Sequence, residues 1–486
     1  MERELTVLNA NQLRIPDDLV YFEAHHAGRV LILNPDSGAY TTLTTEAFAH
    51  LRAYRQGTSA TVTEGVEATL RQLVLKRVVY YGKYAPAFHV SPSNVPYSLY
   101  WETTHGCSLR CEYCYMSADT VLPGELTTDE AASMIRQAAA VGVKRFVFTG
   151  GEAMIRKDLY ELARLARSVG LTTEIITNAT LIRTLEDAIR LKENFDYIIT
   201  SLDGDCPESN DVHRGRGSYE KIVHGMRLLK EAGVSVSINS TISEFNVDRV
   251  QQLMKFVQAN FLVQQHRIIN VAFLGRGNTG SVPYDWRTYK KTHEYIQDLR
   301  RDPQLAAEPG QVMQTPKKAF TPRKNCGMGG GEIYVDAQGK VYPCKLITTP
   351  DWYSGNIKEQ SLAEILHAEA LDRARNMDVD NRKGCRSCMI RRLCGGGCRG
   401  MHMGHSGDAN TNDPQFCWVL RHQTVLGLWM TEQLPQALDE PGAYLPRRLR
   451  DDEVWEPEIG TALPTEEIAD IVTHLERLKP AQLTML

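Results

Sequence analysis

The chain has 486 residues, of which 42% are hydrophobic, and a formal net charge of −4. That length suits one large domain or two to three smaller ones, and the charge gives no reason to expect nucleic acid or an anionic membrane as a partner. No apolar run approaches a membrane span, and residues 1–5 lack the layout of a signal peptide. A cytoplasmic protein is therefore expected, and its eleven cysteines indicate metal or redox chemistry rather than disulfides.

Residues 1–82 are predicted to form a winged-helix-like domain. Three short strands, two helices and a closing strand are expected, in chain order, at 19–23, 30–33, 40–43, 45–54, 64–76 and 78–81. The turn signal Asn34-Pro35-Asp36-Ser37-Gly38 separates the second and third strands. Winged helices most often bind DNA, but the second helix sets Arg71 and Lys76 against two glutamates and is not strongly basic.

Residues 83–96 contain three prolines and are expected to be a linker. Strands and helices then alternate over residues 97–300, which predicts an α/β fold with a parallel sheet. Six strands are expected at 97–102, 145–148, 173–176, 197–202, 234–242 and 268–273. A capping box of Thr127 and Glu130 begins a helix that reaches about Val141. Because six βα units are fewer than eight, a partial barrel is predicted.

Residues 301–430 carry seven cysteines, many glycines and little periodicity, so their fold is expected to depend on metal. Residues 431–486 form a C-terminal tail rich in proline and acid, with a short helix expected at 465–478. The sequence suggests no function for this tail.

The first cysteine group is Cys107, Cys111 and Cys114, with Tyr113 just before the last thiol. Three thiolates can hold three irons of a [4Fe–4S] cluster and leave the fourth iron open. The alternative is a zinc site, but structural zinc needs a fourth ligand, and none stands nearby at finger spacing.

This spacing resembles that of the radical S-adenosylmethionine (SAM) superfamily. The resemblance implies that the open iron chelates SAM, and that reductive cleavage gives methionine and a 5′-deoxyadenosyl radical. Thr149-Gly150-Gly151-Glu152 follows a predicted strand and is similar to the Gly-Gly-Glu motif of that family. The SAM contacts implied by this and looser strand-end matches are Tyr113, Gly150, Gly151, Glu152, Asn178, Ser201 and Arg214.

The second cysteine group spans residues 326–417. Cys344 ends a Gly-x4-Cys motif, and the spacing Cys-x2-Cys-x5-Cys-x3-Cys begins at Cys385. Two interleaved zinc sites are the alternative, although seven thiols fit two four-ligand sites poorly. The pattern resembles the SPASM extension of radical SAM enzymes, which holds two auxiliary [4Fe–4S] clusters. The resemblance assigns Cys385, Cys388, Cys394 and Cys417 to an outer cluster, and Cys326, Cys344 and Cys398 to an inner one.

The inner group has only three cysteines, because residues 319–325 contain none. An open iron there could accept a substrate thiolate; a non-cysteine ligand or a [2Fe–2S] centre is the alternative. Lys345 stands near the position where sulfatase maturases carry an acidic proton acceptor, which disfavours that subclass. Cys206 stands apart and is expected to be a free thiol.

The N-terminal unit resembles a PqqD-like RiPP recognition element, whose relatives capture a leader peptide as an added strand. The order of the three modules is similar to that of radical SAM/SPASM peptide maturases, especially the thioether-forming sactipeptide and ranthipeptide enzymes. This implies a precursor peptide as substrate, a donor such as flavodoxin or ferredoxin, and an auxiliary cluster that accepts the surplus electron.

Thioether formation is the first prediction. Carbon–carbon or ether cross-linking, epimerisation, a non-peptide or folded-protein substrate, and a DNA-binding iron–sulfur redox sensor are the alternatives. The sequence identifies no catalytic proton acceptor.

Overall fold

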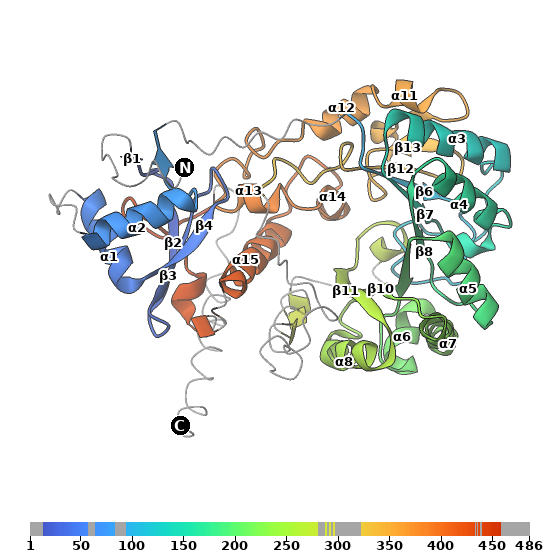
Figure 1. Ribbon diagram of the computed structural model, residues 1–486, viewed down its shortest axis with the longest axis horizontal. Helices are drawn as coiled ribbons and strands as arrows, with labels where there is room; N and C mark the ends of the chain where they lie inside the picture. The colour runs from blue at the N-terminus through green and yellow to red at the C-terminus, as the bar shows by residue number, and fades with distance from the viewer. Residues whose placement is uncertain are drawn as a thin grey trace.

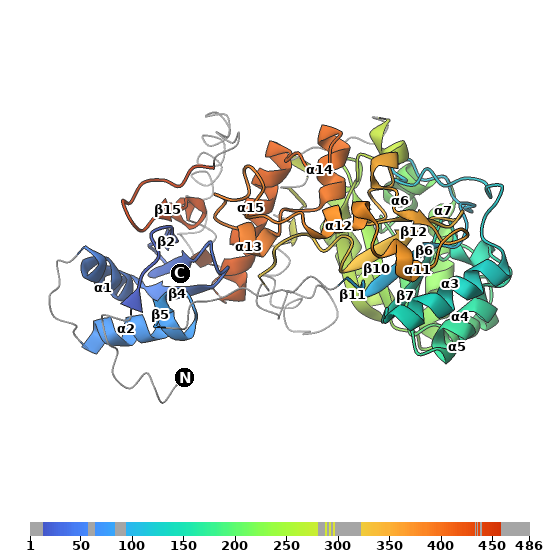
Figure 2. The same ribbon diagram turned by 90° about the horizontal axis from the view of Figure 1, so that it is seen from above.

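The computed structural model describes residues 13–56, 64–82, 94–279, 322–432 and 440–457, with the short pieces 287–288, 291–292, 295–296, 434 and 436–437. The N-terminal unit lies at one end of the molecule and a large sheet covered by helices at the other (Figures 1 and 2). Helices α13 (Arg391–Cys394) and α15 (Pro414–Thr431) of the cysteine-rich region lie between them. The helix expected at 465–478 lies outside the described residues. Within the described ranges, no helix is both long and apolar enough to cross a bilayer.

The large sheet has nine strands in the order β11-β10-β9-β8-β7-β6-β12-β13-β14. Its first six strands, all parallel, are β6 (Ser98–Glu102), β7 (Arg145–Thr149), β8 (Thr172–Ile176), β9 (Tyr197–Ser201), β10 (Val236–Ile242) and β11 (Val263–Asn270). The predicted partial barrel is therefore confirmed. The cysteine-rich region extends the same sheet, because β12 (Glu332–Val335) pairs parallel to β6 and continues antiparallel into β13 (Lys340–Tyr342) and β14 (Gly355–Asn356).

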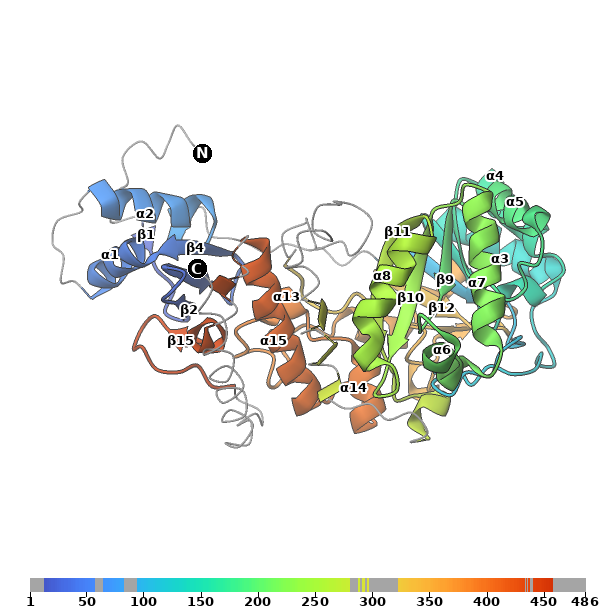
Figure 3. The ribbon, with the colours of Figure 1, turned by 90° about the horizontal axis from the view of Figure 1, so that it is seen from below.

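Helices cover the outer face of the parallel strands (Figures 1 and 3). They are α3 (Thr128–Val141), α4 (Leu159–Ser168), α5 (Leu185–Asn194), α6 (Pro207–Arg214), α7 (Ser218–Glu231) and α8 (Val250–Asn260). Thr127 and Glu130 form the predicted capping box of α3. Alternate strand residues such as Trp101 and Phe148 pack under the helices. The intervening positions, such as Tyr100, face the opposite side of the sheet.

Strand β11 was expected at 268–273 but begins at Val263. The error comes from the polar run Gln264–Arg267, which hides the strand pattern in the sequence. Parallel pairing with β10 imposes the strand: Val236 lies opposite Val263, the register shifts by one residue, and the pairing then runs regularly from Ser237 opposite Gln265 to Ile242 opposite Asn270. Buried His266 shares a hydrogen bond of 2.8 Å with Ser240 of β10, which satisfies one of its ring nitrogens.

The N-terminal strands and helices lie where they were predicted. They are β2 (Val20–Ala24), β3 (Arg29–Leu33), β4 (Tyr40–Thr44), α1 (Thr45–Arg55), α2 (Glu64–Leu75) and β5 (Tyr80–Tyr81). The closing strand β5 does not join the other three; it pairs with β1 (Leu13–Arg14). The sheet instead gains β15 (Arg447–Arg448), which pairs antiparallel to β2, so part of the C-terminal tail packs on the N-terminal unit.

The two faces of this small sheet have different partners. Tyr21, Val30 and Ile32 pack toward α1 and α2. Phe22 and Leu31, on the other face, pack with Trp429 of α15. Little periodicity was expected around α15, yet it is an 18-residue helix. It is apolar on more than one side because it is buried between neighbouring elements. The shorter helices of the region are α11 (Leu362–Ile365), α12 (Glu369–Arg375) and α14 (Arg399–Ser406).

Trp429→Ala is expected to loosen the N-terminal unit. The Trp429 side chain is fully buried and its Nε1 donates to the Ala443 carbonyl at 2.9 Å. Truncation of such a residue costs about 3–5 kcal/mol. Hydrogen exchange followed by mass spectrometry should show faster exchange in β2 and β3. Trp352→Ala, in a separate apolar cluster, is the control; equal protection of β2 and β3 in both variants would contradict the docking described above.

Candidate functional site

The loop between β6 and α3 carries Cys107, Cys111 and Cys114 at the carboxyl ends of the parallel strands, where α/β folds place ligands. Two backbone hydrogen bonds fix the loop to the end of β7: Gly151 N donates to the Thr104 carbonyl at 2.9 Å and Glu152 N to the Gly106 carbonyl at 2.8 Å. A Cβ on Gly151 would lie 2.3 Å from the Gly106 oxygen, and one on Gly150 2.5 Å from the Thr104 oxygen. The two glycines were expected to admit a ligand; the backbone that approaches them is the chain's own cysteine loop.

Glu152 is fully buried directly below this loop. Its carboxylate accepts hydrogen bonds from Met154 N (3.1 Å), Thr177 Oγ1 (2.7 Å) and Asn178 N (2.8 Å). Burial raises the pKa of Glu152, and these hydrogen bonds oppose the rise. The Asn178 amide nitrogen donates to Ser108 Oγ at 3.0 Å and lies 3.8 Å from Cys107 Sγ. Glu152 thus holds Asn178 next to the first cysteine, and their predicted contact with SAM stays a prediction.

Arg214 and Tyr113 meet at a residue to which the sequence gave no role, Asp203. The Asp203 carboxylate, fully buried, accepts from Arg214 Nε (2.7 Å) and Nη2 (3.1 Å) and from the Tyr113 hydroxyl (2.5 Å). Burial lowers the pKa of the Arg214 guanidinium, but Asp203, Tyr113 and Cys111 outweigh this and raise it. In turn, burial raises the pKa of Cys111 to about 12, and Arg214 opposes that rise. A fixed cation therefore lies close to the cysteine loop.

Ser201 ends β9 and lies opposite Asn239 of β10. The Asn239 side-chain oxygen is buried and has no hydrogen-bond partner among the described residues. Arg276 ties the segment after β11 to the cysteine loop, since its Nε donates to the Cys111 carbonyl and its Nη1 to the Ala118 carbonyl, both at 2.9 Å. Arg276 Nη2 is also buried without a described partner.

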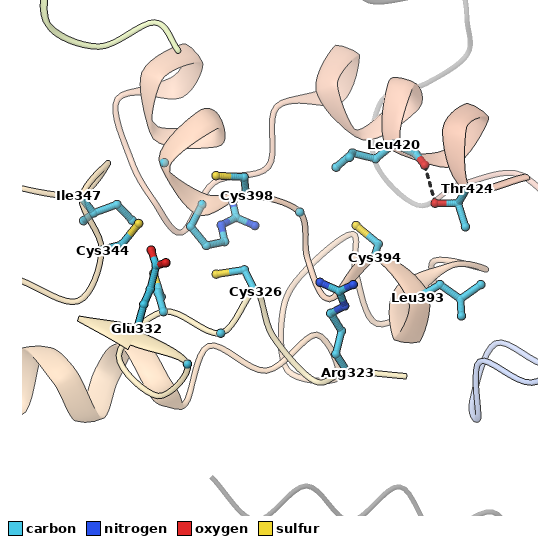
Figure 4. A pocket seen from close by; sticks show the side chains of 16 residues that line it. Arg323, Cys326, Glu332, Cys344, Ile347, Leu393, Cys394, Cys398, Leu420 and Thr424 are labelled. Carbon is cyan, nitrogen blue, oxygen red and sulfur yellow. Dashed lines mark hydrogen bonds between the residues drawn. The ribbon is translucent and has the colours of Figure 1, made fainter. Parts of the chain in front are cut away.

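The inner cysteine group lines a cavity of about 450 Å³ (Figure 4). Cys326, Cys344 and Cys398 reach this cavity from three separate segments, and Cys394 also lines it. Burial raises the pKa of Cys344, and the nearby Glu332 and Cys398 add to the rise. Burial likewise raises the pKa of Cys398, with a contribution from Cys326. The three thiols that the sequence assigned together are therefore neighbours.

The outer group also comes together. Burial raises the pKa of Cys394 to about 12, and Cys388, Cys417 and Cys385 add to this rise. The Asn412 amide nitrogen lies 3.3 Å from Cys385 Sγ and can donate to it. Cys206 is separate from all three groups and contacts Ser209 Oγ at 3.3 Å.

The chemistry of these donor sets fits iron–sulfur clusters. All eleven cysteines are free thiols, ten of them gathered in groups of three, three and four. Across the described ranges, no three His, Cys, Asp or Glu side chains converge closely enough to hold a single metal ion. A cluster in which each thiolate binds its own iron does not require such convergence.

Comparison with known proteins agrees with this geometry. Residues 101–257 match the radical SAM superfamily, and residues 326–389 match the SPASM iron–sulfur cluster-binding domain. An AdoMet-dependent heme synthase of Methanosarcina barkeri is 29% identical over 68% of this chain and 98% of the relative. A PqqA peptide cyclase of Granulibacter bethesdensis is 30% identical over 68% of this chain and 89% of the relative.

Two solved structures share the fold. Native anSMEcpe with bound AdoMet aligns with a TM-score of 0.59 at 20% identity, over 71% of this chain and 99% of that one. Streptococcus suis SuiB bound to the precursor peptide SuiA aligns with a TM-score of 0.52 at 17% identity, over 83% and 99%.

A partial parallel barrel with a three-cysteine loop at its mouth, joined to a region with two further thiol groups, defines an iron–sulfur enzyme. The chain belongs to the radical SAM superfamily and carries a SPASM domain. Its radical SAM domain binds a [4Fe–4S] cluster and SAM, and its SPASM domain binds auxiliary iron–sulfur clusters.

Asp203→Asn is expected to weaken SAM binding at least about tenfold, which corresponds to about 1.4 kcal/mol. The amide cannot balance the buried Arg214 charge, and it removes one acceptor of the Tyr113 hydroxyl. Equilibrium dialysis with labelled SAM, at matched iron content, measures the change. Asp205→Asn is the control, because Asp205 pairs with the half-exposed Arg249. Wild-type affinity in Asp203→Asn would contradict the role given to Asp203.

Proposed function

We propose that the enzyme modifies a ribosomally made precursor peptide and forms an intramolecular thioether in it. The observation that carries the peptide part is an open strand edge in the N-terminal unit, which we infer to be a recognition element for a leader peptide. The strand order is β15-β2-β3-β4, so β15 covers the β2 edge, while no described strand pairs with the outer edge of β4. An extended peptide can add to such an edge through main-chain hydrogen bonds.

On the outer edge of β4, the backbone groups of Thr42 bond to side chains and not to another strand. Thr42 N points away from β3 and donates to Glu432 Oε2 at 3.3 Å. The Thr42 carbonyl accepts from Gln72 Nε2 at 3.3 Å. Side chains thus occupy the donor and the acceptor that an added strand would use. Both hydrogen bonds are long, and a peptide main chain would replace them with regular ladder bonds.

The position of this edge also supports a peptide substrate. The N-terminal unit packs on α15, whose first turn carries Cys417, and the Asp36 carbonyl accepts from Arg392 Nε at 3.0 Å. A leader on β4 would therefore lie beside the cysteine-rich region, from which a following core segment can extend toward the barrel (Figures 1 and 2). The alignment with SuiB, solved with a precursor peptide, covers more of this chain than that with anSMEcpe.

At the barrel mouth, we assign Cys107, Cys111 and Cys114 to the cluster that binds SAM. Once bound, SAM and this cluster supply a radical that abstracts hydrogen. Gly150, Gly151 and Glu152 position the SAM methionine indirectly, because they fix the cysteine loop at the end of β7. Tyr113, Asn178, Ser201 and Arg214 are the proposed SAM contacts, and the Asp203 carboxylate keeps Arg214 and Tyr113 in place.

The inner group of three cysteines favours a thioether over other bonds. The peptide gives up a hydrogen atom from carbon and the proton of a cysteine thiol, and one electron leaves to an auxiliary cluster. The new carbon–sulfur bond therefore costs the peptide two hydrogens. The residue after Cys344 is Lys345, a cation, where sulfatase maturases carry an acidic residue nearby. Lys345 Nζ lies 3.6 Å from Glu332 Oε2 and 4.2 Å from the centre of the Tyr100 ring.

A non-peptide substrate is the second candidate, because the chain covers nearly the whole of a relative named as a heme synthase. That match leaves about a third of this chain unaligned. A reaction that proceeds at the same rate without any peptide would favour this candidate.

Thr42→Pro is expected to weaken leader binding at least about tenfold. Proline removes the outward-facing N–H and also the Thr42 hydroxyl, which donates to Glu432 Oε2 at 2.9 Å. An edge strand tolerates proline, while a paired leader loses a main-chain hydrogen bond. Fluorescence anisotropy with labelled leader peptide measures the affinity, and circular dichroism checks the fold. Thr42→Ala, which removes the same hydroxyl but keeps the backbone N–H, is the control. Equal leader affinity in Thr42→Pro and wild type would rule out strand addition at this edge.

The thioether also predicts the fate of the substrate thiol. After reaction, one cysteine of the precursor should resist alkylation by iodoacetamide, and it should stay resistant after reduction with dithiothreitol, because a thioether is not a disulfide. A fully alkylated product that has nevertheless lost two hydrogens would indicate a carbon–carbon or ether cross-link instead.

A further inference from the structure

Besides Cys326, Cys344 and Cys398, the inner cysteine cavity is lined by Cys394, which is assigned to the outer group, and by one further potential iron ligand. Of the described residues that line it, Glu332 alone carries a carboxylate. Figure 4 shows this carboxylate pointing into the space that the sulfur atoms of Cys326, Cys344 and Cys398 also face. Met328 lines the same cavity, but it packs in an apolar cluster with Ile347 and Trp352. Glu332 is therefore the side chain best placed to act with the three thiols.

Local backbone structure fixes this arrangement. Gly327 and Gly329 have positive φ angles of 94° and 76°, which turn the chain sharply after Cys326. Gly329 N then donates to both the Glu332 carbonyl at 2.9 Å and the Pro343 carbonyl at 3.0 Å. One amide thus joins the start of β12 to the residue before Cys344. These backbone hydrogen bonds link the segments that carry Cys326, Glu332 and Cys344.

The charges around Glu332 suit a metal ligand. Burial is the main cause that raises the pKa of Cys344, and the charge of Glu332 is the second. The Glu332 carboxylate therefore lies close to the Cys344 thiol. Lys345 Nζ lies 3.6 Å from Glu332 Oε2 and balances its charge. The Glu332 side chain is about one quarter exposed, so it can still reach the cavity.

We propose that Glu332 supplies the fourth, exchangeable ligand of the inner auxiliary cluster. Carboxylate oxygen binds iron, but thiolate is the softer and better match for an iron–sulfur cluster. A substrate thiolate can therefore displace Glu332, whose freed carboxylate remains paired with Lys345. The inference rests on the assignment of Cys326, Cys344 and Cys398 to one cluster; it does not require that the reaction product be a thioether.

The test uses the full chain with Cys107, Cys111 and Cys114 replaced by alanine, so that only the auxiliary clusters remain. This parent, reconstituted without oxygen with iron-57, is compared with the same protein carrying Glu332→Gln or Glu332→Cys. Mössbauer spectra should show a minority iron site with an oxygen ligand in the parent. Glu332→Cys should convert that site to a thiolate site, and Glu332→Gln should bind 2-mercaptoethanol at least about tenfold more tightly. Glu359→Gln, at an exposed glutamate outside the cavity lining, should match the parent.

Identical spectra and thiol affinities in the parent, Glu332→Gln and Glu332→Cys would overturn the assignment. Unchanged spectra with loss of peptide modification in the otherwise intact enzyme would also overturn it, and would place Glu332 on the substrate. If the parent itself held iron for one auxiliary cluster only, the assignment of the three cysteines would fail first. That result can be told apart from an error about Glu332 alone, because the parent protein still carries Glu332.

Discussion

The loop of Cys107, Cys111 and Cys114 can lie at the mouth of the barrel only because Gly150 and Gly151 have no side chains. The loop backbone approaches these glycines so closely that any Cβ would meet a carbonyl oxygen at 2.5 Å or less. This contact aligns the loop with the end of β7 and brings Glu152, Asn178 and the first cysteine together. The rest of the site is arranged around that docking, from the buried ion pair of Asp203 and Arg214 to the anchor that Arg276 provides.

Two elements of the cysteine-rich region, β12 and α15, join it to the barrel and to the N-terminal unit. Strand β12 belongs in sequence to the cysteine-rich region yet pairs with β6, so Glu332 and Cys344 are fixed relative to the barrel. Helix α15 carries Cys417 in its first turn and packs through Trp429 on the N-terminal sheet. The N-terminal sheet is thereby packed against the helix that carries Cys417 of the outer thiol group.

Much of this could be predicted from the sequence, because the signals are local. Cysteine spacing and the family resemblance suggested the thiol groups, of which Cys326, Cys344 and Cys398 line one cavity, and strand–helix alternation predicted the partial barrel. Contacts between distant segments could not be predicted. Asp203 lies 90 residues from Tyr113, and β15 joins β2 from over 400 residues away. The sequence did not indicate Glu332, because a fourth inner ligand was expected before Cys326. Glu332 follows Cys326 in the chain and approaches it through a turn at Gly327 and Gly329.

The most direct test of the central claim is mass spectrometry of candidate precursor peptides after an anaerobic reaction with the reconstituted enzyme, SAM and a reductant. A peptide should lose two hydrogens for each cross-link while 5′-deoxyadenosine forms, and fragmentation should place the new bond at a cysteine sulfur. An unchanged peptide mass with peptide-dependent 5′-deoxyadenosine would point to epimerisation. The formation of 5′-deoxyadenosine with no effect of any peptide would contradict the assignment of a peptide substrate.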